Sequence, residues 1–417
     1  MERRDQSKTV HTYIGVLMDQ YMKTSETLRE IHQFITEKYY EVEDFSLCIL
    51  LSMISGTNMI ALGQPGIAKS AVLREVVKLI EFDGHEGTPY FHIQMGSDVS
   101  PNHVFGAPDI DYFKKHGIIK RHFEGFLPDA IIAFCSEFYR VNDQVANSGL
   151  LTILNEGEFK NGVDTIQTKL RFFMADTNFF PKQMDDLDVE ETDLKLQALH
   201  DRFLSRVLVK PVSDQANKVK MVLMDDTYTT DIRLSLDDLI AVQDHLKEIQ
   251  LGEDIASLMV LISTTLEQNH SIFISPRRLK LSRNLVKAHA YFSGRSYCVA
   301  EDLIALQFSF WQKEEDIIKA LDCIYDVMNK PQHDAHAFDE VLQSILDELD
   351  RNIDNQRDFD DFDIAALYEQ AIEDCTKLTE RILMAYPDPE RYVDVNASYK
   401  EVSLTYKRLM TEHDAVG

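Results

Sequence analysis

The sequence has no apolar run that approaches the roughly 20 residues a membrane-spanning helix needs. Its longest apolar run, at residues 47–54, is interrupted by serine and stops at Gly56. The charged N-terminus, MERRDQSKTV, also lacks the apolar core of a signal peptide. We therefore expect a cytoplasmic protein.

Cysteine and histidine do not occur at the spacings that zinc sites and redox motifs use. The five cysteines are scattered, form no CxxC pair and lie mostly in apolar segments, so we expect buried free thiols. The 14 histidines form no HExxH motif, and no GxSxG sequence typical of serine hydrolases is present. The sequence therefore offers no zinc-peptidase or serine-hydrolase site.

Basic residues are also scarce, because 43 lysines and arginines stand against 70 aspartates and glutamates. A net charge of −27 repels nucleic acid over most of the surface, so we do not expect nucleic acid as the main partner. Basic or metal-bearing protein partners fit this charge better. The length of 417 residues exceeds what one core usually holds and predicts two or three domains.

Strands alternate with helices between residues 58 and 212. Apolar segments typical of buried strands occur at residues 58–62, 90–94, 129–138, 170–178 and 206–212. Two segments predict hairpins, IDYFKKHGIIKRHF around Gly117 and EFKNGVDTIQ around Asn161–Gly162. The pattern predicts an α/β fold in which a parallel sheet has helices on both faces and the hairpins are insertions.

After residue 213 the apolar residues recur only at helical spacing. The tail beyond Pro331 continues with helical patterns near residues 337–353, 361–386 and 398–412. We therefore predict three domains, which are an α/β core, an all-helical domain and an acidic helical region at residues 1–212, 213–330 and 331–417.

The segment GQPGIAKS, at residues 63–70, lies between a predicted strand and a predicted helix. In a P-loop, backbone N–H groups wrap phosphates at a helix N-terminus, where the helix dipole also favours anions. Lys69 would reach the β- and γ-phosphates of ATP, and Ser70 would bind Mg²⁺. Ala68 departs from the strict pattern GxxxxGK[ST]. The predicted nucleotide-binding residues are Gly63, Gln64, Pro65, Gly66, Ile67, Ala68, Lys69, Ser70 and Ala71.

Six further segments follow this loop in a characteristic order: FGAPDI, GFLPDAIIAFCSEFYRV, LLTILNEGEFKNG, LRFFMADTN, LHDRFLSR and SPRRLKLSRNLVKAHAYFSGRS. In this set the chain resembles the MoxR AAA+ ATPases, and within them the RavA-type regulatory ATPases. The resemblance implies an AAA+ αβα core, a helical lid, ATP and Mg²⁺ as cofactors, and a ring-shaped homo-oligomer, hexameric by analogy. It also implies a protein client that the ring remodels, and a von Willebrand A-domain protein as a partner.

The resemblance assigns roles to residues at two strand ends. The Walker B strand ends in Ser136–Glu137 where the family has Asp–Glu, so Glu137 would polarise the attacking water and Ser136 stands at the metal position. A serine carries no charge to offset Mg²⁺, and Asp129 lies at the wrong end of the strand to substitute. Asn178 matches sensor 1. A weakly hydrolysing ATP-binding scaffold is therefore the alternative to an active ATPase.

Arginines complete the implied site. Arg202 matches the arginine finger that a neighbouring subunit supplies, and Arg206 could share that role. Arg277, at the start of a helix capped by Ser275, matches sensor 2, with Arg278 as the less favoured candidate.

Two segments keep open interpretations. The basic segment at residues 114–123 is either a loop that contacts substrate or DNA, as in a nucleic-acid motor, or a solvated hairpin. The tail either docks a partner protein or forms a helical cap on the lid.

Overall fold

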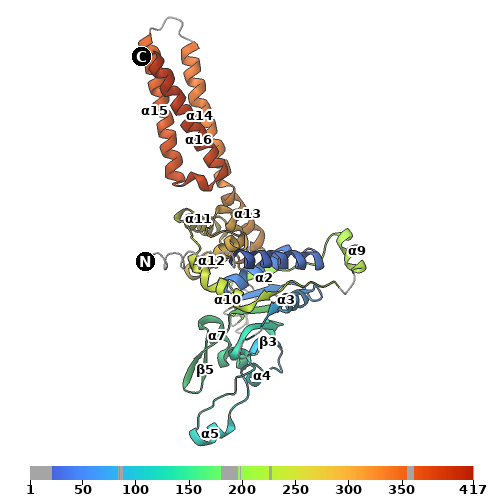
Figure 1. Ribbon diagram of the computed structural model, residues 1–417. Coiled ribbons are helices and arrows are strands. Elements are labelled where there is room, and N and C mark those ends of the chain that lie inside the picture. Colours follow the sequence, from blue (N-terminus) through green and yellow to red (C-terminus); the bar gives the residue numbers. More distant parts are fainter. Residues whose placement is uncertain are drawn as a thin grey trace, which may run out of the picture. The chain divides into compact units, whose positions relative to one another are not determined.

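The computed structural model describes residues 21–82, 84, 88–179, 196–197, 199–224, 228–354 and 361–416 (Figure 1). The chain forms two units. The first combines Met1–Gly252, Ser263–Cys298 and Asp302–Ala320, and the second combines Glu253–Ile262, Val299–Glu301 and Leu321–Gly417.

A five-stranded parallel sheet is the centre of the first unit, with the strand order β3–β4–β7–β1–β8. Its strands β1, β4 and β7 are buried at every position, because they are apolar and covered on both faces. All five carboxyl ends meet at one edge of the sheet, and β7 lies between β4 and β1. The strands are β1 (Met59–Leu62), β3 (Thr88–Gln94), β4 (Ala130–Ser136), β7 (Phe172–Thr177) and β8 (Ser205–Leu208).

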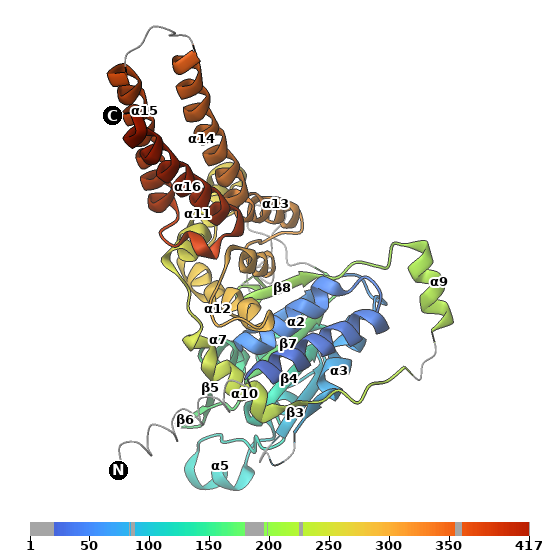
Figure 2. The same cartoon turned by 45° about the horizontal axis from the view of Figure 1, so that its top comes forward.

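Helices α2 and α3 pack against this sheet (Figure 2). Helix α2 (Glu43–Ser55) contacts β1 and β8, and its apolar segment from Cys48 to Ile54 is buried on all sides. It ends at Gly56, whose left-handed φ of 63° closes the last turn. Residues 21–38 are also helical. The remaining helices before residue 236 are α3 (Lys69–Lys78), α4 (Pro101–Phe105), α5 (Ile110–His116), α6 (Asp143–Val145), α7 (Leu151–Glu156) and α9 (Gln215–Leu223).

The prediction of a hairpin around Gly117 is wrong, because the first half of that segment is helix α5. Asp109 caps this helix by accepting a hydrogen bond from Tyr112 N at 2.8 Å. Gly117 ends it in a left-handed conformation. A cap residue followed eight residues later by a helix-ending glycine is a local helix signal. It outweighed the β-forming residues that suggested a strand.

Basic side chains of this segment make local contacts. Lys120 Nζ lies 2.6 Å from Asp164 Oδ2, and Arg121 Nη1 donates to Gly106 O at 2.8 Å. Lys114 and Lys115 are exposed on α5. Part of the basic character of the segment is therefore used to hold its own loop.

The hairpin predicted around Asn161–Gly162 is confirmed. Strands β5 (Glu158–Asn161) and β6 (Asp164–Gln167) pair antiparallel, and Gly162 has the positive φ of 70° that a tight turn requires. A separate two-stranded sheet joins β2 (Ile80–Glu81) and β9 (Leu234–Ser235) in parallel.

After residue 213 the described elements are helices, as the spacing of apolar residues predicts, with one exception: the two-residue strand β9 departs from that prediction. A 3-10 helix at Ala300–Phe308 lies between two of them. The helices before the tail are α10 (Leu236–His245), α11 (Glu253–His270), α12 (Pro276–Phe292) and α13 (Asp316–Met328).

The tail of the second unit forms a three-helix bundle of α14 (Lys330–Asp354), α15 (Asp361–Ala385) and α16 (Val393–Val416) (Figures 1 and 2). Phe338, Cys375, Ile382 and Val402 are among the buried residues of its core. The helical character predicted for this region is confirmed.

The architecture confirms the predicted fold class, a parallel α/β sheet with helices followed by helical segments. All five cysteines are buried free thiols. Within the described part of the chain, no helix has the length and apolar character to cross a membrane.

Candidate functional site

The loop that joins β1 to α3 is bent by residues with positive φ. At Gly63, where φ is 148°, a Cβ atom would collide with Val209 O, so the position requires glycine. Gly66 has a φ of 82°. Ala68 also lies in the left-handed region, with a φ of 62°, at a cost of about 1–2 kcal/mol for a residue with a side chain. The alanine thus keeps a backbone conformation that glycine adopts without strain.

The Lys69 side chain is buried at the start of α3, with 5% of its surface exposed. Its ammonium donates to Gly63 O at 2.6 Å, to Gln64 O at 2.7 Å and to Asn178 Oδ1 at 3.0 Å. Burial lowers the pKa of Lys69, and the nearby carboxylates of Asp176 and Glu137 oppose that effect. The loop, the predicted sensor and the lysine therefore form one polar cluster.

Glu137 follows β4 directly in a left-handed conformation, with a φ of 52°. Its Oε1 atom accepts a hydrogen bond from Asn178 Nδ2 at 2.5 Å. Its Oε2 atom lies 3.4 Å from Arg140 Nε, and within the described residues this buried atom accepts no hydrogen bond. One carboxylate oxygen is thus held by a hydrogen bond, and the other has, in the described part of the chain, only the ion pair with Arg140.

Asp176, at the end of β7, joins this cluster although sequence reasoning did not select it. Its Oδ2 atom accepts a hydrogen bond from the Ser70 hydroxyl, and its Oδ1 atom accepts one from Glu137 N at 2.9 Å. Only 4% of its surface is exposed. The available signal was an acid at the carboxyl end of an apolar strand, two residues before the predicted sensor Asn178.

A cavity of about 450 Å³ lies over this cluster. The predicted residues Ser136, Glu137 and Asn178 line it together with loop residues 65–71, whereas Gly63 and Gln64 contribute carbonyl groups to Lys69 from outside the lining. Three lining residues were not predicted: Arg74, Gln94 and Asp176.

The residues of the cavity fit a nucleoside triphosphate with a magnesium ion. The N-terminus of the ten-residue helix α3 supplies N–H groups and a favourable dipole, and Lys69 supplies a positive charge for phosphate oxygens. Ser70 and Asp176 bring together a hydroxyl and a carboxylate, which are oxygen ligands of the kind that Mg²⁺ selects.

The family comparison agrees with this geometry. A model described as the MoxR domain in the MoxR-vWA-beta-propeller ternary systems matches residues 26–250, more than half of the chain. The chain belongs to the MoxR family of AAA+ ATPases. A model of the AAA lid domain matches residues 254–324 of this MoxR protein.

This MoxR protein is also similar to two curated proteins and to a solved structure. Two uncharacterized proteins of Methanocaldococcus jannaschii are similar to it: MJ0079 is 29% identical, covering 80% of this chain and 82% of the relative, and MJ0812 is 26% identical, covering 77% and 80%. The crystal structure of a candidate ATPase from Cytophaga hutchinsonii has a TM-score of 0.56 at 15% identity, covering 76% of this chain and 98% of that one. The structural match supports the fold alone.

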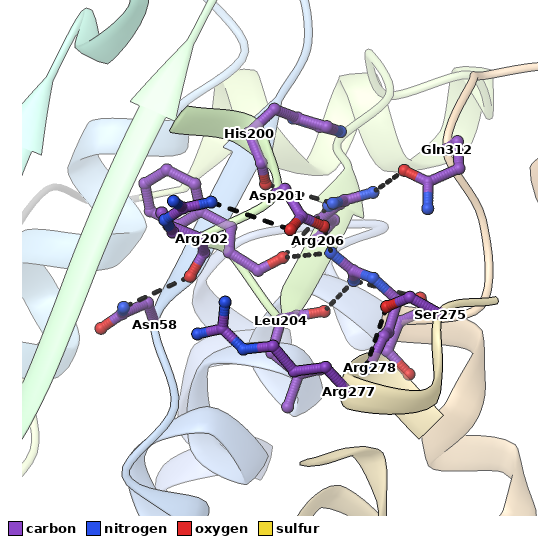
Figure 3. A network of polar contacts seen from close by, with 12 residues as sticks. Asn58, His200, Asp201, Arg202, Leu204, Arg206, Ser275, Arg277, Arg278 and Gln312 are labelled. Carbon is purple, nitrogen blue, oxygen red and sulfur yellow. Dashed lines mark hydrogen bonds and ion pairs between the residues drawn. The ribbon is translucent and has the colours of Figure 1, made fainter. Parts of the chain in front are cut away.

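Two arginines of this MoxR protein are buried within the first unit (Figure 3). Arg206 is fully buried, and its guanidinium donates to four oxygens, on Phe203, His200, Trp311 and Gln312, at 2.9–3.2 Å. Burial, helped by the charge of Arg278, holds the pKa of Arg206 well below its usual value. Because this side chain is enclosed by its own chain, it cannot extend to a neighbouring subunit. We therefore assign Arg206 a structural role in place of the predicted finger role.

Arg278 has a similar structural position. It is 3% exposed and donates to Leu204 O at 3.1 Å, Phe203 O at 3.2 Å and Ser309 O at 3.2 Å. Its Nη2 atom also lies 3.3 Å from Asp201 Oδ1 (Figure 3). These bonds fix helix α12 to the loop before β8.

Arg202 and Arg277 differ from the buried pair. Arg277 is exposed and donates to Asn155 Oδ1, and the Arg202 side chain is 25% exposed beside Asp201 (Figure 3). Neither lines the cavity of its own chain. The structure thus brings together the predicted loop residues, Ser136, Glu137 and Asn178, and leaves the two predicted arginines outside.

Proposed function

We propose that this protein binds Mg·ATP in the cavity at the end of β1 and hydrolyses it. The observation that carries the proposal is the convergence of Lys69, Glu137 and Asn178 near the N-terminus of α3, where the Asn178 amide is hydrogen-bonded to both of the other side chains. A charged donor, a carboxylate and a polar side chain that orients both are the groups that phosphoryl transfer to water requires.

Each residue has a defined task in this proposal. Lys69 exchanges its contacts with the loop carbonyls for the β- and γ-phosphate oxygens, and the N–H groups of residues 66–70 bind the remaining oxygens. Glu137 accepts a proton from the attacking water, and Asn178 holds the carboxylate in place. Bound Mg²⁺ would offset the negative charge of the β- and γ-phosphates, with Ser70 as a ligand.

The arginines support assembly into a ring. Arg202, the predicted finger, and Arg277, the predicted sensor 2, both lie outside the cavity of their own chain, and the charge of Arg202 is the one that a neighbouring copy would receive. An arginine that enters from a neighbour would stabilise charge in the transition state and make hydrolysis depend on assembly. We propose a homo-oligomeric ring, hexameric as in RavA-type relatives.

The partner follows from the family. The matching family model is named after ternary systems of MoxR, vWA and beta-propeller proteins. We propose that ATP turnover in this cytoplasmic ring remodels a protein client that contains or accompanies a von Willebrand A domain. The helical tail, residues 331–417, is the proposed contact for such a partner.

Nucleotide binding by the purified full chain tests the core of the proposal. Wild-type protein should bind a fluorescent ATP analogue, and Lys69→Ala should bind it about 10- to 100-fold more weakly, because a hydrogen bond from a charged group contributes about 1.5–3 kcal/mol. Lys78→Ala, at the exposed end of the same helix, is the matched control. Wild-type protein that binds no adenine or guanine nucleotide would contradict the assignment.

A catalytically weak scaffold is the second candidate, and Ser136 is the observation that favours it. Its hydroxyl lines the cavity at the position where the family carries an aspartate. Steady-state hydrolysis distinguishes the two: a scaffold would bind ATP, yet its turnover would equal that of Lys69→Ala.

A further inference from the structure

The cavity contains a carboxylate one strand away from its usual position. Strands β4 and β7 pair in parallel up to Cys135 and Ala175, so Ser136 and Asp176 are the next residues on each strand. Ser136 stands where MoxR relatives carry the Walker B aspartate, and Asp176 places an acid at the same level on the neighbouring strand. Adjacent strands are about 4.8 Å apart, so a carboxylate at this level of either strand lies near the same end of the cavity.

The strand order favours the new position. Strand β7 lies directly beside β1, which leads into the phosphate-binding loop, whereas β4 is one strand farther away. Asp176 therefore reaches Ser70, the first-turn hydroxyl of α3, and accepts its hydrogen bond. Ser136 makes no such bond within the described residues.

The burial of Asp176 requires polar or charged partners that compensate for the lost hydration of its carboxylate. An aspartate with 4% of its surface exposed is costly unless hydrogen bonds or a cation offset the loss of water. The Glu137 N–H donates a hydrogen bond to one carboxylate oxygen, and the Ser70 hydroxyl donates one to the other. The carboxylate also acts on the nearby Lys69, because its negative charge raises the pKa of that lysine. The side chain is thus fixed with an oxygen beside the hydroxyl that ligates the metal in P-loop proteins.

We propose that Asp176 replaces the Walker B aspartate as the acidic group of the Mg²⁺ site. This inference rests on the proposed binding of Mg·ATP and concerns which residue of this chain supports the metal. It removes the reason to expect poor turnover from Ser136, because the negative charge is retained and only its strand has changed.

The competing explanation is that Asp176 only ties β7 to α3 through Ser70. The two explanations differ in what the acid does for metal affinity. A structural tie would lower stability when removed and leave the effect of Mg²⁺ on nucleotide affinity unchanged. A metal-site acid would alter that effect even in a well-folded variant.

The test measures ATP affinity with Mg²⁺ and with EDTA for the wild-type full chain and for Asp176→Asn. The ratio of the two affinities should fall at least tenfold in the variant, since loss of a group that supports metal ligands typically costs 10- to 100-fold in metal affinity. Electron paramagnetic resonance of Mn²⁺ in the presence of ATP reports the metal directly. Asp129→Asn is the matched control, because Asp129 is a buried acid at the opposite end of β4 and should leave the ratio unchanged.

The outcomes separate this inference from the proposed function. A ratio in Asp176→Asn within twofold of wild type, in protein that unfolds at a normal temperature, overturns the role of Asp176 and leaves ATP binding intact. No nucleotide binding by wild type overturns both.

A double variant that exchanges the residues at positions 136 and 176 tests the inference if Asp176→Asn does not fold. Ser136→Asp combined with Asp176→Ser returns the acid to β4 and keeps the number of charges. We expect this double variant to recover the wild-type ratio to within about threefold, because the oxygens are interchangeable between the two strands. A folded double variant whose affinity for ATP is the same with Mg²⁺ and with EDTA contradicts the inference.

Discussion

Asn178 donates its side-chain N–H to Glu137 across the ends of β7 and β4, with Nδ2 2.5 Å from Oε1. The oxygen of the same amide accepts from Lys69 at 3.0 Å. One side chain therefore connects the group that would contact phosphate with the group that would activate water.

Glu137→Gln should separate binding from hydrolysis. The amide keeps the size of the side chain and loses the capacity to accept a proton, so turnover should fall about 10²- to 10⁴-fold. Nucleotide affinity should stay within about threefold of wild type, because Lys69 and the loop N–H groups are unchanged. Phosphate release and equilibrium binding measure the two quantities. Glu156→Gln, an exposed acid at the end of α7, is the control. Full activity of Glu137→Gln would show that another group activates the water.

Arg202→Ala should lose activity that a second inactive variant can restore. If the guanidinium serves a neighbouring subunit, Arg202→Ala and Lys69→Ala are each inactive alone by about 10³-fold or more. Mixed rings contain some interfaces with both groups intact and should regain part of the activity. Phosphate release across a series of mixing ratios measures this complementation. Activity that never exceeds the sum of the two separate proteins would refute a role between subunits.

Arg206→Met should unfold the protein more easily, without any specific effect on ATP. Methionine leaves four oxygens without their donor, and each hydrogen bond to a charged group contributes about 1.5–3 kcal/mol. We expect a loss of about 3 kcal/mol or more in the free energy of unfolding, measured by denaturant titration. Arg277→Met, at an exposed arginine on α12, should change it by about 0.5 kcal/mol or less. Equal effects of the two substitutions would contradict the structural role of Arg206.

Ala68→Gly should not destabilise the protein, although glycine usually weakens the interior of a helix. The left-handed backbone at Ala68 costs about 1–2 kcal/mol, while glycine loses about 0.4–1 kcal/mol through a more flexible unfolded chain. The net change is a gain of about 0–1.6 kcal/mol with nucleotide affinity retained. Ala71→Gly, three residues later in α3, should lose about 0.5–1 kcal/mol instead. Thermal unfolding and ATP binding compare the pair, and a loss at both positions would show that Ala68 is not strained.

His200 should make the protein less stable in mild acid. Burial lowers the pKa of His200 well below 6.5, and the charges of Arg206 and Arg278 lower it further. The unfolded chain therefore binds a proton that the folded chain does not, so the free energy of unfolding falls as pH drops below about 6.5. The loss approaches about 1.4 kcal/mol per pH unit until the folded pKa is reached.

The control for this prediction is a comparison of unfolding at pH 7.5 and pH 5.5 for wild type, His200→Gln and His116→Gln. His200→Gln removes the titrating group and should flatten the dependence, whereas the exposed His116 should leave it as in wild type. An equally steep dependence in His200→Gln would assign the effect to other groups.

Sequence reasoning succeeded where neighbouring residues decide the structure. The order of apolar strand, glycine loop and helix predicts the P-loop because all three lie within residues 58–80, and β1 and α3 confirm the strand and the helix. The helical spacing after residue 213 was equally informative, although it missed the short strand β9. The prediction around Gly117 failed although the deciding signal was also local, since Asp109 and Gly117 are typical helix-cap residues. The predicted domain boundaries at residues 212 and 330 stay predictions.

Tertiary contacts decided what pattern matching could not. Arg202 and Arg206 lie four residues apart in the same motif, yet one is partly exposed and the other is fully enclosed. Two of the residues that enclose Arg206, Trp311 and Gln312, lie about a hundred positions away along the chain. A short motif contains no information about which of its cations those distant residues will cover.

The sequence by itself determined the glycine loop between β1 and α3, most of the order of strands and helices, and many of the residues that line the cavity, because each depends on contiguous residues. Only the tertiary structure decided that Asp176 stands beside Ser70, since the two are separated by 106 positions and meet where parallel strands end together. In the sequence, a serine at the Walker B position indicates that the carboxylate of the metal site is lost. In the folded protein, Asp176 on the neighbouring strand places a carboxylate beside that position.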